Sequence, residues 1–140
     1  MSPPVAPAPI LALRKAIRDR LVADAALLAR LGGPRVVDRA PRDMPAPFLW
    51  LAEAEARDWS TGDGRGHEHR LALVVVSREG GPAEALWLAE RAAALLDDAP
   101  LEPDGHRLVL LRVVATELRR GEGAQAARAT LRLRALTEVL

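Results

Sequence analysis

The chain has 140 residues, of which 49% are hydrophobic and 28% are charged, and it contains no cysteine. These values predict one globular domain and exclude a disulfide framework, a thiolate nucleophile and a cysteine-ligated zinc or iron–sulfur site. Twenty basic against nineteen acidic residues give a formal net charge of +1, which excludes a strongly basic nucleic-acid coat but permits a local charged patch.

The N-terminal part of the chain predicts an arm followed by two helices. Residues 1–9 are rich in proline and alanine, so we expect a flexible arm before a single α+β domain over 10–140. Apolar residues at spacings of three and four predict an amphipathic helix from Ile10 to Leu21. Asp24 is placed to cap a short second helix, and Gly32 stands where that helix should end. Prolines interrupt the early apolar stretch, so it does not resemble a signal peptide, and no apolar run is long enough to cross a membrane.

The middle of the chain predicts three strands. A short strand over 35–38 is followed by an extended connection over 39–47, whose prolines cannot lie in the middle of a sheet. The next strand covers 48–55. Residues 60–67 hold three glycines in a polar loop. The strand over 70–77 is apolar on both faces, which predicts a central place in the sheet.

The last part of the chain predicts a helix and a β-hairpin. The main helix covers 83–97, and a long strand over 107–118 is again apolar on both faces. After a glycine turn, a closing strand over 124–136 alternates apolar residues with arginine and threonine. The order of elements predicts an α+β fold: a mostly antiparallel sheet of four to five strands, with an N-terminal helix and one main helix packed on it.

No group of residues in the sequence predicts catalysis or metal binding. His67 and His69 would share one side of a strand, but a metal site needs three or four ligands and His106 stands apart in sequence. The glycines of TGDGRG precede a strand and not a helix, which favours a hairpin loop over a phosphate-binding loop. Ser60 and Ser77 lie in no nucleophile elbow. We therefore expect no enzyme activity, no bound metal and no cofactor.

Two sets of residues are candidates for contacts with other molecules. The first is a stripe of arginines on the last two strands, which either binds carboxylates of a neighbouring subunit, or binds phosphates, or forms a solvated face. Its members are Arg119, Arg120, Arg128, Arg132 and Arg134. The second is the glycine-rich loop, where a tryptophan at the edge is suited to anchor an interface. Its candidate residues are Trp59, Asp63, Arg65 and His67. With no tyrosine and one phenylalanine in the chain, a base-stacking platform is not expected.

Four stretches occur in a characteristic order. They are the opening helices over 10–33 with an L-x-A-D break, a short strand and spaced prolines over 35–51, a strand ending in Ser-Arg before a glycine turn and a helix over 73–96, and a closing hairpin with alternating arginine over 118–138. In this order and spacing they resemble the tail-completion or tail-terminator family of long-tailed phages, which also occurs in bacterial gene transfer agents. The loop at 60–67 departs from that pattern by its glycine content.

The resemblance implies a structural role. Similar proteins form a six-membered ring on the head-proximal end of the tail tube, which stops tube polymerisation, presents a surface to the head connector and lets DNA pass through its lumen. The implied partners are further copies of the chain, the tail tube protein, a head connector or stopper protein, and DNA without sequence specificity, with no membrane. We expect the chain in a virion or phage-like particle at the head–tail junction, assembled in the bacterial cytoplasm.

Three alternatives stay open from the sequence. The nearest is a neck adaptor or stopper protein at the same junction. A second is a small nucleic-acid-binding module that uses the stripe of Arg128, Arg132 and Arg134. A third is a small enzyme, for which the sequence signals no pocket of convergent groups.

Overall fold

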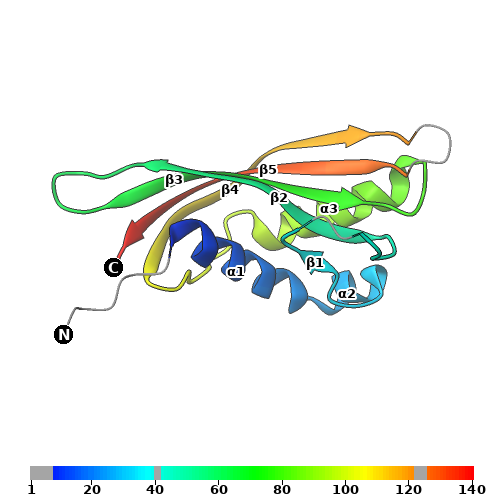
Figure 1. Ribbon diagram of the computed structural model, residues 1–140, viewed down its shortest axis with the longest axis horizontal. Helices are drawn as coiled ribbons and strands as arrows, with labels where there is room; N and C mark the ends of the chain where they lie inside the picture. The colour runs from blue at the N-terminus through cyan, green and yellow to red at the C-terminus, as the bar shows by residue number, and fades with distance from the viewer. Residues whose placement is uncertain (1–7, 40–41, 122–125) are drawn as a thin grey trace.

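The structure is a computed structural model that describes residues 8–39, 42–121 and 126–140. In this part of the chain, three helices lie on one face of a five-stranded sheet (Figure 1). The elements in chain order are α1 (Pro9–Val22), α2 (Ala25–Leu31), β1 (Val36–Val37), β2 (Phe48–Asp58), β3 (Gly66–Val76), α3 (Pro82–Leu96), β4 (His106–Arg119) and β5 (Arg128–Val139). The predicted α+β fold is confirmed. Most of the predicted N-terminal arm lies outside the described residues.

The second helix begins and ends where its capping residues predict. The side chain of Asp24 accepts a hydrogen bond of 2.9 Å from the backbone N–H of Leu27, and Gly32 ends α2 in the left-handed conformation with φ 77°. Asp24 also pairs with Arg91 of α3, which lowers the pKa of the Asp24 carboxyl. One carboxylate thus caps α2 and joins it to α3.

The sheet has the strand order β1-β2-β3-β5-β4. β1 is parallel to β2, and all other pairs are antiparallel, so two hairpins meet along β3 and β5. The predicted central place of β3 is confirmed. The hairpin of β2 and β3 is longer than predicted, because ladder pairing continues through charged residues to Asp58 opposite His67. His67 is therefore a strand residue and not, as predicted, part of the loop.

β4 is an edge strand, although its sequence is as apolar on both faces as that of β3. Every residue from Val114 to Arg120 is exposed, because β5 separates this end of β4 from α3 (Figure 1). Two irregularities in the pairing with β5 fall at Val109 and Val114, and both valines are exposed. Bulges of this kind turn side chains outward on an edge strand.

The core lies between the helices and the sheet. Small residues on α3, such as Ala85, Ala89 and Ala92, are fully buried, which lets the helix approach the sheet closely. The largest fully buried side chains are Leu13, Ile17, Leu21, Leu27, Leu31, Leu49, Leu73, Leu88, Leu96, Leu111, Leu131 and Leu133. No helix in the described ranges has the length and apolar character that crossing a bilayer requires.

Candidate assembly surfaces

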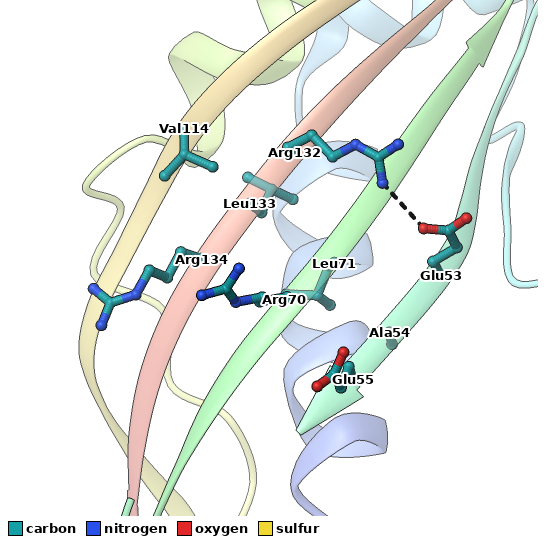
Figure 2. Close-up of a pocket in the computed structure, with 9 residues that line it drawn as sticks. All are labelled: Glu53, Ala54, Glu55, Arg70, Leu71, Val114, Arg132, Leu133 and Arg134. Carbon is teal, nitrogen blue, oxygen red and sulfur yellow. Dashed lines mark hydrogen bonds and ion pairs between the residues drawn. The ribbon is translucent and has the colours of Figure 1, made fainter. Parts of the chain in front are cut away.

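The face of the sheet opposite the helices carries part of the arginine stripe. Alternation along β5 buries Leu131 and Leu133 under the helices and turns Arg132 and Arg134 to the open face. A shallow hollow of about 660 Å³ lies over this face (Figure 2). It is lined by Glu53, Ala54, Glu55, Arg70, Leu71, Val114, Arg132, Leu133 and Arg134. Charges of both signs line the hollow, so it is not a positive ridge.

Arg132 is held by carboxylates from two other strands. Its Nη1 donates to Glu53 Oε2 of β2 at 3.0 Å, and its Nε lies 3.5 Å from Glu117 Oε1 of β4. The first contact passes over β3 at Ala72, whose small side chain is the register partner of both Arg132 and Glu53. The two carboxylates raise the pKa of the Arg132 guanidinium, Glu117 most strongly.

Arg134 is paired in the same manner with one strand. Its Nε and Nη2 both lie 2.8 Å from Glu68 Oε2 on β3. The side chains of Arg132 and Arg134 are 42% and 39% exposed. Two of the five arginines of the stripe are thus neutralised within the subunit.

Arg119, Arg120 and Arg128 form a separate group at the other end of the sheet. All three are exposed, and none has an ion-pair partner within the ranges that the structure describes. Arg119 and Arg128 are register partners on β4 and β5. Like charges directly opposite each other destabilise a sheet. This group is the part of the predicted stripe that remains available to an external anion.

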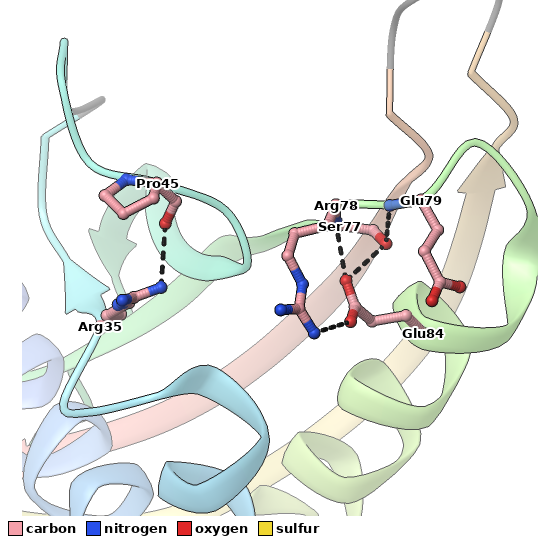
Figure 3. Close-up of polar contacts among 6 residues, drawn as sticks. All are labelled: Arg35, Pro45, Ser77, Arg78, Glu79 and Glu84. Atoms are coloured by element: carbon pink, nitrogen blue, oxygen red, sulfur yellow. Dashed lines mark hydrogen bonds and ion pairs between the residues drawn. The ribbon is translucent and has the colours of Figure 1, made fainter.

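The connection from β3 to α3 is bonded to this end of the sheet, because the Gly121 and Ala127 N–H groups donate to the carbonyls of Gly80 and Glu79. Figure 3 shows the side-chain contacts that hold this connection. Glu84, in the first turn of α3, accepts hydrogen bonds from Ser77 Oγ at 2.9 Å and from the backbone N–H of Arg78 at 2.7 Å. Arg78 Nη2 pairs with the other oxygen of Glu84 at 2.9 Å. Three donors lower the pKa of Glu84 against the opposing effect of burial. Nearby, Arg35 donates to the Pro45 carbonyl at 3.2 Å. The Ser-Arg before the glycine turn therefore fixes where α3 begins.

The candidate partner-binding loop is a tight hairpin end. The backbone N–H of Trp59 donates to Gly66 at 2.8 Å, and that of Thr61 donates to Gly64 at 2.9 Å. A Cβ at Gly66 would lie 2.8 Å from the Trp59 carbonyl oxygen, so only glycine fits there. A hollow of about 290 Å³ includes Trp59, Asp63 and Arg65, with Arg107 and Glu138 from the strands beside it. Three of the four residues predicted for this loop, Trp59, Asp63 and Arg65, therefore line one hollow.

The fourth predicted residue, His67, is half-buried and lies beside the buried His69. His69 is fully buried, and its Nε2 lies 2.8 Å from the hydroxyl of Thr137. The rings of His67 and His69 lie 6.3 Å apart between centroids. Burial, followed by the charges of His67 and His106, lowers the pKa of His69 to about 4. In the described part of the chain, no three His, Asp or Glu side chains converge as metal ligands.

Sequence reasoning missed the acidic partners of the stripe. Glu53, Glu68 and Glu117 stand on three different strands, and only the strand order brings them to β5. The sequence feature that could have indicated these partners is the alternation of Glu53 and Glu55 along β2. It identifies an acidic face of that strand but does not tell which strand lies beside it.

Two comparisons with known proteins agree with one another. The family model described as "Tail completion protein gp17" matches residues 15–138. Among solved structures, the chain is similar to a chain of the "Virion of native gene transfer agent (GTA) particle", with a TM-score of 0.82 and 32% sequence identity. That similarity covers 93% of this chain and 98% of the other. No curated protein matches the chain.

Proposed function

This chain belongs to the family of tail completion protein gp17, and we propose that it forms a ring that caps the tail tube. The coarser role follows from the family: the chain is a structural tail-completion protein of phage-like particles. The finer role has six copies closing a ring at the head-proximal end of the tube. That ring stops tube polymerisation, joins the tube to the head connector, and leaves a lumen for DNA. In this role, residues 10–140 act as one domain behind the arm of residues 1–9, and they carry no catalysis.

The observation that carries this proposal is the full-length similarity to a chain of a gene transfer agent virion, at 32% identity over 93% of the sequence. The charge of the open sheet face supports the DNA passage. Arg132 and Arg134 are already paired with Glu53 and Glu68, so fewer cations on this face are free to retain phosphates.

The experiment is electron microscopy of particles from a strain that lacks the gene. We expect detached heads together with overlong or ragged tail tubes, because nothing then ends tube growth. Normal particles would overturn the proposal.

A neck adaptor or stopper at the same junction is separated from a tube cap by its binding partner. Purified protein should bind the ends of isolated tail tubes. Binding to the portal-side ring and not to tubes would instead identify an adaptor.

A further inference from the structure

The sheet has two free edges, and the first is the end of β4. The outer side of β4 is covered in its middle by the segment after α3, because Asp97 accepts from the Val113 N–H at 2.9 Å and the Asp98 N–H donates to the Leu111 carbonyl at 2.8 Å. Beyond Val113, the outer backbone groups of Val114–Arg119 have no partner among the described residues. An uncovered edge of this kind is a template for another strand.

The second free edge is the end of β2. β1 pairs with β2 only at Leu49 and Trp50, and Arg14 donates to the Leu51 carbonyl at 3.2 Å. Beyond Leu51, the outer backbone groups of Glu53–Asp58 have no partner in the part of the chain that the structure covers. β2 and β4 lie toward opposite lateral edges of the same sheet, so one free edge is found at each edge.

The two edges are compatible in direction. Each of the pairs β2–β3, β3–β5 and β5–β4 is antiparallel, so β2 and β4 run in opposite directions. When β4 of one copy is placed beside β2 of the next, with the helices on the same side, the pair is antiparallel. The ladder then continues from one copy into the next.

The charges on the two edges select one register. Glu55 and Arg57 of β2 and Glu117 and Arg119 of β4 all lie on the open face, as their register partners on β3 and β5 show. One register sets Glu117 opposite Arg57 of the next copy. The same register sets Arg119 opposite its Glu55, and Leu118 opposite its Ala56 on the helix side.

The neighbouring registers are less favourable. A shift of two residues in one direction sets Arg119 opposite Glu53 but Glu117 opposite Glu55, so a like-charge pair offsets the opposite-charge pair. A shift in the other direction sets Arg119 opposite Arg57, which places like charges together. A shift of one residue would move every side chain to the wrong face. Charge and face therefore agree on a single pairing.

We propose that the contact between copies in the ring is this sheet-edge pairing, with Thr116–Arg119 of one copy added to Glu55–Asp58 of the next. The inference rests on the ring of the proposed function and identifies its contact surface. The contact is heterologous, so each copy uses both edges, which is the type of contact from which a closed ring is built. It covers Leu118, which is 37% exposed. It also supplies Glu55 to Arg119, which faces Arg128 and has no counter-ion among the described residues.

The first test is a charge exchange measured by native mass spectrometry and negative-stain microscopy, on the protein alone and on tail tubes. Arg119→Glu and Glu55→Arg should each abolish rings, and the double variant should restore them. Arg120→Glu is the matched control, since it makes the same charge change one residue away, opposite Ala54 on the other face, and should keep the rings. Unchanged melting curves establish that each variant is folded.

The second test is a register-specific disulfide in a chain that has no cysteine of its own. Directly opposed Cα atoms in an antiparallel pair lie within the range that a disulfide spans. Oxidised Ala56→Cys/Leu118→Cys should give a ladder of covalent oligomers on a denaturing gel, and Ala54→Cys/Leu118→Cys should not.

The outcomes separate the two proposals. A wild-type chain that forms no ring, alone or on tubes, overturns the proposed function. Wild-type rings that persist in Arg119→Glu, with no ladder from the cysteine pair, overturn the edge pairing and leave the ring in place.

Discussion

At the scale of single residues, the arginines of the stripe differ in the charge of the side chains next to them. Arg132 and Arg134 lie against carboxylates, and Arg119 and Arg128 lie against each other. The sequence shows alternating arginine for both groups. The difference in their surroundings arises because different residues of the neighbouring strands lie opposite them.

Removing the paired arginines should have a small effect on stability. We expect Arg132→Ser to lower the free energy of unfolding by about 0.5–1 kcal/mol, because half-exposed ion pairs contribute little. Arg70→Ser, an exposed arginine with no ion pair in the described ranges, is the control and should change it by less than about 0.5 kcal/mol. Urea unfolding measures both, and a loss above about 3 kcal/mol for Arg132→Ser would contradict this assignment.

The buried His69 should make stability depend on pH. Its pKa is lowered from 6.5 to about 4 in the folded state, so the unfolded chain binds a proton more readily. The contribution of neutral His69 to stability is therefore fully present above pH 6.5. It is lost as pH falls toward 4, by an amount on the order of 3 kcal/mol. Urea unfolding of wild type and His69→Gln at several pH values measures this. Since glutamine does not titrate, the variant should lose less over that interval, and parallel curves would count against the assignment.

At the scale of elements, helices and strands differ in how far the sequence predicts them. The caps at Asp24 and Gly32 are local, and α2 begins and ends as they predict. β2 continues beyond its predicted end at residue 55, because its last residues are held by the ladder to β3 and not by their own apolar character. The ion pairs of Arg132 were beyond prediction, since they depend on a strand order that places β5 between β3 and β4.

The tight end of the β2–β3 hairpin should depend on one glycine. We expect Gly66→Ala to lower the free energy of unfolding by about 1–3 kcal/mol, because its Cβ would meet the backbone oxygens of Trp59 and Thr137 at 2.8 and 3.0 Å. Gly62→Ala, where nothing lies within 4 Å, should have almost no effect. Thermal melting of the two variants compares them directly, and equal melting temperatures would refute the close approach.

At the scale of the whole molecule, the formal net charge of +1 and the neutralised sheet face predict weak interaction with DNA. Among the residues that the structure describes, three arginines without an ion pair lie near the same end of the sheet, namely Arg119, Arg120 and Arg128.

Binding to duplex DNA should therefore be weak and only moderately sensitive to salt. Since each neutralised phosphate contributes about −0.9 to the slope of log affinity against log salt, we expect a slope no steeper than about −3. Fluorescence anisotropy at several salt concentrations measures it. A much steeper slope with tight binding would favour a nucleic-acid-binding module over a tail cap.

The position of Arg132 has a mechanical consequence for the sheet. Its guanidinium reaches Glu53 on β2 and Glu117 on β4, so a single side chain spans the four longest strands at right angles to their direction. The hydrogen bonds of an antiparallel ladder also run perpendicular to the strands, so this tether repeats the direction of the ladder at the level of the side chains. A pull on β2 or β4 is therefore shared with the strands between them through side chains as well as through the backbone.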